Sequence, residues 1–349
     1  MGHNLSLVRG VVGEGVAVAL VTKADAYGHG LIPVSRYAAR NGADWIAVAT
    51  VQEGIALRDA GMDVPVIVLS PMLPVEAEQA VFYGLDVVVE RVETASALSR
   101  AASAEREARV HLKIDTGLSR FGASPEEAAA VATKIAALPN LSLVGISQHF
   151  SNASDDSVTQ LQVQRFEQAL ADCEKAGLEF EWVHMANSTA ASNRPESRKN
   201  LVRIGMSAYG FGKPAQEMGC KPVLSWSARV TAMRTVPAGT ALSYGGTHVV
   251  KRESRIATVG AGYGDGYPRS AGGRSSVILH GSAVPVVGTV CMDQILADVT
   301  EIPDVEIGDV ATLIGEGATA DALAEAADTI AHEILTRIMS RVPRRYEFG

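Results

Sequence analysis

The sequence of 349 residues is poor in cysteine and in clustered positive charge. Its three cysteines (Cys173, Cys220 and Cys291) are an odd and sparse set that provides no disulfide framework. Such usage indicates a reducing compartment, so we expect the cytoplasm. The 31 Lys and Arg residues are outnumbered by 39 Asp and Glu, which gives a net charge of −8. Nucleic-acid binding requires clustered basic side chains, so we expect no nucleic-acid partner.

Long apolar runs are also missing. The apolar stretch at 11–21 is short, is interrupted by Glu14 and leads directly into Lys23 and Asp25. A membrane-spanning helix needs about 20 apolar residues, and a secretion signal begins with basic residues. We therefore expect no membrane partner, and we interpret 11–21 as a loop followed by a buried strand.

Short apolar runs, by contrast, are frequent. Apolar residues make up 47% of the chain, enough to fill large cores. Eight short runs rich in apolar and β-branched residues are typical of strands buried on both faces of a sheet. They lie at Val16–Thr22, Trp45–Thr50, Pro65–Ser70, Leu85–Glu90, Arg109–Ile114, Leu141–Gln148, Phe180–Met185 and Leu201–Ile204.

Stretches with helical spacing separate most of these runs. One begins at Ser124-Pro125, where serine suits the N-cap and proline the first helical position. Another ends near Gly177, since glycine commonly terminates a helix. Alternating strands and helices imply parallel strands with right-handed crossovers. Eight strands favour a (β/α)8 TIM barrel, predicted at residues 1–217, over an open doubly wound sheet, which remains the alternative.

After the predicted barrel the composition changes. Valine, threonine, serine and glycine dominate, and apolar and polar residues alternate, which is typical of strands with one solvated face. We predict a mainly β domain at residues 218–349, with one helix at Asp321–Ala331. The expected strands lie at Leu224–Val236, Arg255–Val259, Val277–Leu279, Val284–Val290 and Ile295–Val299.

Polar residues that could carry chemistry follow the predicted barrel strands. Functional side chains of such barrels lie at the carboxyl ends of the strands. Lys23 ends the first strand, where desolvation would lower its pKa and allow a Schiff base; the alternative is an ordinary surface lysine. Arg120, in a glycine-flanked turn after the fifth strand, could grip a carboxylate or phenolic oxygen, or be a solvated turn residue. His149 ends the sixth strand and could orient a neighbour or be a core histidine.

The seventh and eighth strands are followed by candidate phosphate ligands. Ser188 comes after the seventh strand, and Gly205 and Met206 come after the eighth. Barrels commonly bind phosphate with these two loops, and a hydroxyl with backbone amides suits that task. Simple turn chemistry is the alternative, but the two features occur together at the right strand ends.

Nine segments, in order along nearly the whole chain, resemble the motifs of one family. The chain is similar to the pyridoxal-phosphate-dependent alanine racemases, which are isomerases built from a barrel followed by a β domain. The segments are KADAYGHG at 23–30, KIDTGLSRFG at 113–122, HFSNA at 149–153, HMANS at 184–188, RIGMSAYG at 203–210, SYGGTH at 243–248, GYGDGYPR at 262–269, CMD at 291–293 and RVPR at 341–344.

The resemblance implies a reaction with two catalytic residues. By resemblance, Lys23 binds pyridoxal 5'-phosphate and acts as the base on the D-face of the substrate. Tyr244 is the opposing base on the L-face and comes from the partner subunit, so a homodimer with shared active sites is implied. Racemisation needs two such groups, since one removes the α-proton and the other returns it. The implied substrate is alanine, and the implied role is D-alanine supply for peptidoglycan.

Further residues receive roles by resemblance. Arg203 faces the pyridine nitrogen and keeps it unprotonated, because an arginine can only donate; His149 lies behind Arg203. Arg120 and the backbone amide of Met292 bind the substrate carboxylate. Lys113 matches a lysine that is often carbamylated. The implied phosphate contacts are Tyr27, Ser188, Gly205 and Met206.

Two departures from the family pattern stand out. Family chains begin earlier, with a strand that leads into the His-Asn-Leu found here at 3–5, so we expect that strand to be missing, with consequences for dimer stability. His332 occupies a position where the family has a tyrosine near the phosphate and the substrate pocket. We hypothesise that serine is accepted beside alanine; a neutral exchange is the alternative.

Other functions are less compatible with the sequence. A non-catalytic pyridoxal-phosphate carrier would need neither a second domain nor Tyr244. A decarboxylase with a related barrel would lack the SYG and CMD elements found here at 243–245 and 291–293. The histidines show no paired spacing for a metal, so we expect no metal site. Cys291 lacks a Cys-His signature, and we interpret it as a thiol that lines the site.

Overall fold

The computed structural model describes residues 1–347, and these form two compact units. Unit 1 contains most of the first 220 residues, and unit 2 contains most of the remainder together with two short inserted segments from the first part. Unit 1 consists of Met1–Ala26, Gly30–Ala208 and Lys213–Cys220; unit 2 consists of 27–29, 209–212 and the chain from 221 onward.

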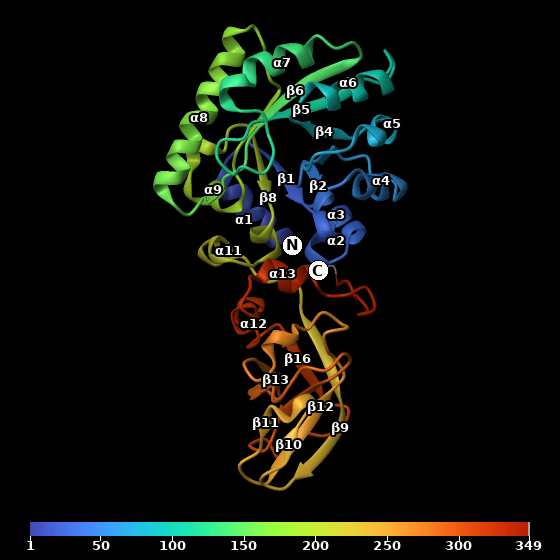
Figure 1. Ribbon diagram of the computed structural model, residues 1–349, viewed down its shortest axis with the longest axis vertical. Helices are drawn as coiled ribbons and strands as arrows, with labels where there is room; N and C mark the ends of the chain where they lie inside the picture. The colour runs from blue at the N-terminus through green and yellow to red at the C-terminus, as the bar shows by residue number, and fades with distance from the viewer. Residues whose placement is uncertain (348–349) are drawn as a thin grey trace. The chain divides into compact units, whose positions relative to one another are not determined.

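Unit 1 is an eight-stranded parallel barrel, as predicted (Figure 1). The strands are hydrogen-bonded in the order β7-β6-β5-β4-β3-β2-β1-β8. Between β7 and β8 the backbone N–H of Arg203 donates to the carbonyl of Ala186 at 3.0 Å. The strands are β1 (Ala17–Val21), β2 (Trp45–Val48), β3 (Val66–Val68), β4 (Asp86–Val89), β5 (Ala108–Lys113), β6 (Leu141–Ser147), β7 (Trp182–His184) and β8 (Leu201–Ile204).

The helices that alternate with these strands lie around the outside of the barrel (Figure 1). The Ser124 hydroxyl accepts the amide of Glu127 at 3.3 Å, which confirms the predicted helix start there. No helix among residues 1–347 is long and apolar enough to cross a membrane. The helices are α3 (Leu31–Arg40), α4 (Val51–Asp59), α5 (Ala77–Phe82), α6 (Val92–Ala101), α7 (Ala128–Ala136), α8 (Asp156–Lys175), α9 (Ser188–Asn193), α10 (Met206–Tyr209) and α11 (Lys213–Met218).

The helix α1 (Gly2–Val12) was not predicted, and it corrects the interpretation of residues 11 and 12 as loop. Leu5, Val8 and Val12 are buried along one stripe of this helix. Their spacing of three and four residues is helical, so the signal was present in the sequence.

Unit 2 is built on a six-stranded antiparallel sheet in the order β14-β13-β16-β9-β12-β15. β16 was not predicted. Only the first two residues of the predicted run at 284–290 belong to a strand, since β14 ends at Pro285 and Val286 forms an isolated bridge to Ala297. The predicted helix at 321–331 ends early: α12 stops at Ala327 because Asp328 adopts a left-handed conformation with φ 58°, and a second helix begins at Ala331. The elements are β9 (Trp226–Val236), β10 (Ala241–Leu242), β11 (His248–Val249), β12 (Ser254–Val259), β13 (Ser276–Leu279), β14 (Ser282–Pro285), β15 (Ile295–Asp298), β16 (Val310–Ile314), α12 (Ala320–Ala327) and α13 (Ala331–Thr336).

Candidate active site

The segment that follows β1 is a left-handed helical turn, α2 (Lys23–Gly28). The four residues 24–27 have φ between 52° and 54°. This conformation costs non-glycine residues about 1–2 kcal/mol each, so tertiary contacts must hold it. Glu53 Oε1 accepts the Ala24 amide at 2.7 Å, and Asp25 Oδ1 accepts the Leu31 amide at 2.7 Å. The strained turn therefore begins at Lys23, which matches the expectation that strain gathers at functional positions.

Cationic side chains gather at the carboxyl ends of the barrel strands. Burial, then the charge of Arg120, lowers the pKa of Lys23. Lys113 is buried at the end of β5, and desolvation followed by the charges of Arg203 and Arg120 holds its pKa well below the usual value. Mutually repelling cations in a partly desolvated site are stabilised by an anionic ligand. A cofactor with phosphate and phenolate groups, and a substrate with a carboxylate, fits this set of side chains.

Arg203 is the most tightly held of these cations. The residue is 5% exposed, and burial lowers its pKa to about 10. Nη1 donates to His184 Nδ1 at 2.8 Å and to the His184 carbonyl at 2.9 Å. Nη2 donates to the carbonyls of Gln148 at 2.7 Å and Met185 at 3.1 Å, and it lies 3.3 Å from His149 Nδ1. Contacts from two neighbouring strand ends thus fix the plane of the guanidinium.

The pKa values of the two histidines around Arg203 are lowered, which favours their neutral forms. Burial, then the charge of Arg203, lowers the pKa of His149 to about 2. The same two causes lower the pKa of His184 well below its ordinary value. Each imidazole therefore has one nitrogen free to accept, which is what a donor such as Arg203 requires.

This neutrality predicts a loss of stability in acid. His149 is unprotonated in the folded protein above about pH 2, whereas an unfolded histidine takes up a proton below about pH 6.5. The unfolded state then binds more protons, so the free energy of unfolding falls as the pH drops below about 6.5. We expect His149 to contribute a fall of about 1.4 kcal/mol between about pH 7.5 and about pH 5.5.

Urea unfolding at the two pH values measures this contribution. The fall should be smaller by that amount in a His149→Gln variant, and unchanged in a variant of the exposed His3. An equal fall in wild type and His149→Gln would show that His149 is protonated in the folded state.

The candidate phosphate ligands of unit 1 lie together. The Gly205 amide donates to the hydroxyl of Ser188 at 3.0 Å, which joins the loop after β7 to the loop after β8. Asn187 caps α9, since its side chain accepts the Ala190 amide at 3.0 Å. Met206 is 7% exposed. The hydroxyl and the backbone groups of these loops are therefore placed side by side, as a phosphate ligand would need.

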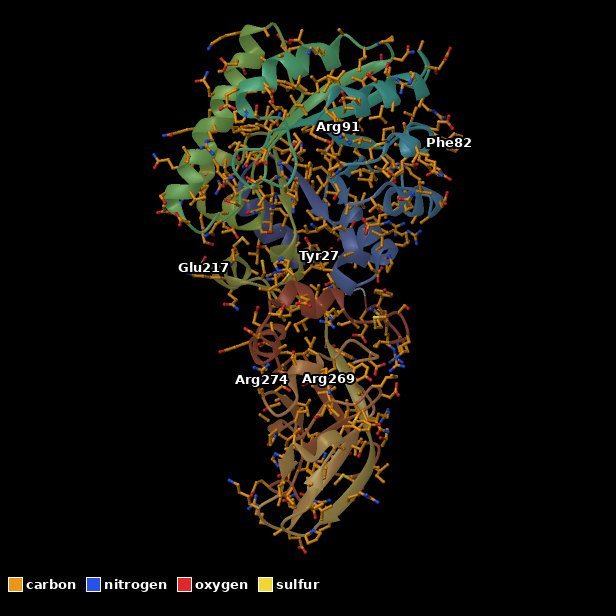
Figure 2. The ribbon with its side chains drawn as sticks, viewed as in Figure 1. Tyr27, Phe82, Arg91, Glu217, Arg269 and Arg274 are labelled. Atoms are coloured by element: carbon orange, nitrogen blue, oxygen red, sulfur yellow. The ribbon has the colours of Figure 1, made fainter. Side chains whose placement is uncertain are left out.

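Tyr27, which is labelled in Figure 2, is the remaining candidate phosphate ligand. It belongs to unit 2. Its ring centroid lies 5.1 Å from that of Tyr209 and 5.8 Å from that of His332, and burial raises the pKa of its phenol to about 12. Next to it, a Cβ at Gly28 would lie 2.1 Å from the Leu335 carbonyl, and φ is +77°, so only glycine fits. His332, which stands where the family has a tyrosine, therefore lies beside Tyr27.

Tyr244 and Met292 both lie in unit 2, on exposed segments. Tyr244 is 72% exposed and Met292 is 53% exposed. The Met292 carbonyl accepts the Gly264 amide at 2.7 Å. The Cys291 thiol lies 3.6 Å from the hydroxyl of Ser243. The second expected base and the second substrate contact therefore come from one loop region of unit 2, and Cys291 lies in the same region.

The structure brings the candidate residues together in two groups. Unit 1 assembles Lys23, Lys113, Arg120, His149, Ser188, Arg203, Gly205 and Met206. Unit 2 contributes Tyr27, Tyr244, Met292 and His332. Sequence reasoning assigned no role to His184, although it binds Arg203 more closely than His149 does. His184 could have been found from the sequence, because it lies at the end of β7 and inside the family motif at 184–188.

Comparisons with known proteins agree with this architecture. The family model of the alanine racemase N-terminal domain matches residues 1–213, and that of the alanine racemase C-terminal domain matches residues 223–346. An alanine racemase of Halothermothrix orenii is 42% identical over 99% of this chain and 93% of its own length. One of Salinispora tropica is 41% identical over 99% of this chain and 95% of its own length.

Solved structures give the same result. The crystal structure of alanine racemase from D-cycloserine-producing Streptomyces lavendulae superposes with a TM-score of 0.92 at 36% identity, over 100% of this chain and 94% of that one. An alanine racemase of Clostridium difficile superposes with a TM-score of 0.93 at 31% identity, over 97% and 91%. Fold, motif order and both domain models coincide, and the chain belongs to the alanine racemase family.

Proposed function

We propose that this chain interconverts L-alanine and D-alanine with pyridoxal 5'-phosphate as cofactor. The observation that carries the proposal is the cationic group of Lys23, Arg120 and Arg203 at the barrel's strand ends, in a chain of this family. When bound, the cofactor withdraws electrons from the α-carbon of the amino acid and makes its α-proton acidic. The protein's part is to hold cofactor and substrate and to move that proton.

Two residues move the proton. Lys23 holds the cofactor and exchanges the α-proton on the D-face; its lowered pKa favours the neutral amine that can accept a proton. The Tyr244 hydroxyl exchanges the proton on the L-face. Tyr244 is 72% exposed in its own chain, which suits a residue that serves the site of a partner subunit. The assembly proposed is a homodimer in which the domain at 218–349 completes the partner's active site.

The remaining residues bind and orient. Arg203 would donate to the pyridine nitrogen of the bound cofactor and keep it unprotonated, because a guanidinium can only donate. Arg120 and the Met292 amide hold the substrate carboxylate. The amine of Lys113, with its depressed pKa, is suited to carbamylation, which would turn one of the repelling cations into an anion facing Arg120. Tyr27, Ser188, Gly205 and Met206 would hold the phosphate of the bound cofactor.

The proposed physiological role is the supply of D-alanine for peptidoglycan in the cytoplasm. A racemisation assay on purified protein with added pyridoxal phosphate tests the activity. We expect D-alanine to form from L-alanine and L-alanine from D-alanine until the two are equal. Bound cofactor without racemisation of either isomer would instead support the alternative of a non-catalytic carrier.

His332 predicts how the chain treats serine. The histidine at this position differs from the family's tyrosine in reach and hydrogen bonding, and it lies 5.8 Å, ring to ring, from Tyr27. We expect His332→Tyr to lower the ratio of kcat/KM for serine to that for alanine about tenfold, a usual size for one changed pocket contact. Racemisation of both amino acids by both proteins measures the ratio. An unchanged ratio would show that histidine in place of tyrosine at position 332 does not affect substrate preference.

A further inference from the structure

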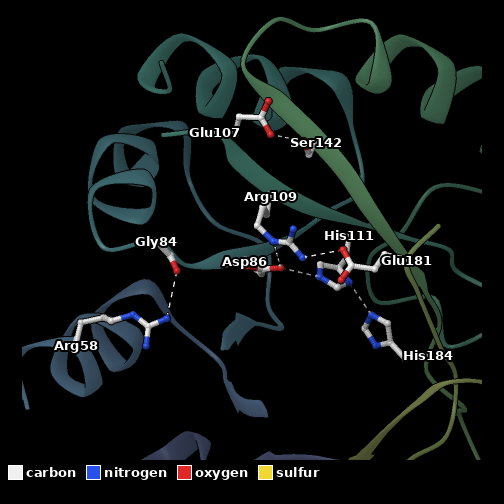
Figure 3. A network of polar contacts seen from close by, with 9 residues as sticks. All are labelled: Arg58, Gly84, Asp86, Glu107, Arg109, His111, Ser142, Glu181 and His184. Carbon is white, nitrogen blue, oxygen red and sulfur yellow. Dashed lines mark hydrogen bonds and ion pairs between the residues drawn. The ribbon is translucent and has the colours of Figure 1, made fainter. Parts of the chain in front are cut away.

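Figure 3 shows a chain of polar contacts inside the barrel that links Asp86, His111 and His184. His184 in turn contacts Arg203. His184 Nδ1 lies 2.8 Å from Arg203 Nη1, and its Nε2 lies 3.0 Å from His111 Nδ1. His111 Nε2 lies 3.2 Å from Asp86 Oδ2. These residues come from β8, β7, β5 and β4, and the two imidazoles are fully buried. None of the three residues behind Arg203 has a role in the function proposed above.

The direction of every hydrogen bond in this chain is determined. Arg203 can only donate, so Nδ1 of His184 accepts, and the proton of this neutral imidazole is on Nε2. That proton is donated to His111, whose Nδ1 must accept. His111 then donates from Nε2 to Asp86, which accepts. One carboxylate at the far end therefore selects the tautomers of both imidazoles.

The barrel is shaped to hold His111. It is opposite Gly145 of β6, and the register of β5 and β6 shifts between Val110 and His111. A Cβ at Gly145 would lie 2.1 Å from His111 Nδ1, so the glycine provides the room for the imidazole. On another side the ring meets Trp45 edge-on, with centroids 6.0 Å apart. A bulge, a glycine and a tryptophan together define the orientation of one histidine.

The carboxylate of Asp86, at the outer end of this hydrogen-bond chain, is also paired with a cation. Arg109 Nε donates to Asp86 Oδ2 at 3.2 Å, and its Nη2 donates to Glu181 at 3.1 Å. Burying two imidazoles and a carboxylate inside a barrel is unfavourable unless every group is paired, and these groups are paired. Ordinary barrel interiors are filled by branched apolar side chains, so a continuous polar chain at this place calls for a function.

We propose that Asp86, His111 and His184 are positioning residues that hold the Arg203 guanidinium in place by fixing the tautomer of His184. The inference deepens the proposed function and rests on it, since Arg203 acts there on the cofactor nitrogen. If His184 carried its proton on Nδ1, two donors would face each other and the guanidinium would turn away. The chain excludes that state because Asp86 accepts and never donates.

The tautomers are measurable without any assay of activity. We expect nitrogen-15 NMR of histidine-labelled holoenzyme to show that His111 and His184 are both neutral, with the proton on Nε2. The protein has eight histidines, and the spectra of His111→Phe and His184→Asn assign the two signals. A proton on Nδ1 of His184, or a charged His184, would overturn the proposal. This result is independent of whether the wild type racemises alanine.

Kinetics then separate positioning from packing. His111→Phe keeps a ring but removes the acceptor, so we expect kcat for alanine to fall about tenfold with KM within about twofold. His111→Asn retains an acceptor near the Nδ1 position and should recover most of the loss. Glu107→Gln is the matched control: Glu107 accepts from Ser142 at 2.6 Å beside the start of β5 but has no link to the chain (Figure 3), and we expect no change.

Two outcomes of the kinetics would contradict the proposal. If His111→Phe had full cofactor content and an unchanged kcat, the position of Arg203 would not depend on His111 and Asp86. Equal losses in His111→Phe and His111→Asn would assign His111 to packing alone. The wild type could also show the predicted tautomers but no racemisation. That result would support the hydrogen-bond chain and refute the proposed activity.

Discussion

Replacing Lys23 with alanine is expected to abolish racemisation in both directions, by about 10³-fold or more. If the proposed function holds, the variant loses the covalent attachment of the cofactor and one of the two groups that exchange the α-proton. Burial and the charge of Arg120 lower the pKa of this half-buried amine, which favours the neutral form that reacts. The measurement is the rate of D-alanine formation, together with the mass of borohydride-reduced protein, which should show no bound cofactor.

Lys134→Ala is the matched control for this variant. Lys134 is exposed on α7, and its loss removes an amine of the same kind without touching the strand ends. We expect full activity and full cofactor content. Retention of cofactor attachment in Lys23→Ala would assign the attachment to another lysine, with Lys113 the first to test.

Tyr244→Phe is expected to stop the interconversion of L-alanine and D-alanine. The variant should still exchange the α-hydrogen of D-alanine with solvent. Without the hydroxyl, no group acts on the L-face, and racemisation should fall by about 10²–10⁴-fold. Lys23 still acts on the D-face, so D-alanine should exchange its α-hydrogen with deuterated water although no L-alanine forms. Exchange is read by NMR, and Tyr83→Phe is the control. If Tyr244→Phe also stopped the exchange of the α-hydrogen of D-alanine, the two residues would not have separate roles.

Mixing the two inactive variants tests the shared active sites. A heterodimer of Lys23→Ala and Tyr244→Phe chains contains one site with both native residues if Tyr244 serves the partner. Random assembly then restores about one quarter of the wild-type activity, since half of the dimers are mixed and each has one complete site. No recovery after co-refolding would place Tyr244 in the site of its own chain.

The barrel strands were predictable because they are short, apolar and buried on both faces. All eight predicted runs overlap observed strands, and the last run coincides with β8 at both ends. The helix α1 was missed because its last two residues, 11 and 12, were interpreted as loop and the apolar spacing of Leu5, Val8 and Val12 was not used. The predicted helix at 321–331 fails at Asp328, where a left-handed residue ends α12, a conformation that local sequence signals only weakly.

The site was predictable where its residues lie within motifs. Lys23, Arg120, His149 and Arg203 were each found at or just after a strand end, by position or by resemblance. The contacts among them were not predictable. Asp86 begins a strand, and His111 lies inside one, at positions where a sequence pattern indicates core residues only.

The sequence by itself determined the fold class, the family and the identity of the candidate residues, because periodicity and motif order are local properties of the chain. The tertiary structure decided which groups touch. His111 and His184 are 73 residues apart, and Asp86 and His111 are 25 apart, yet they form one directed hydrogen-bond chain. Its direction follows from a guanidinium that can only donate and a carboxylate that only accepts. That relation exists only after the strands pair and Gly145 provides the room for His111.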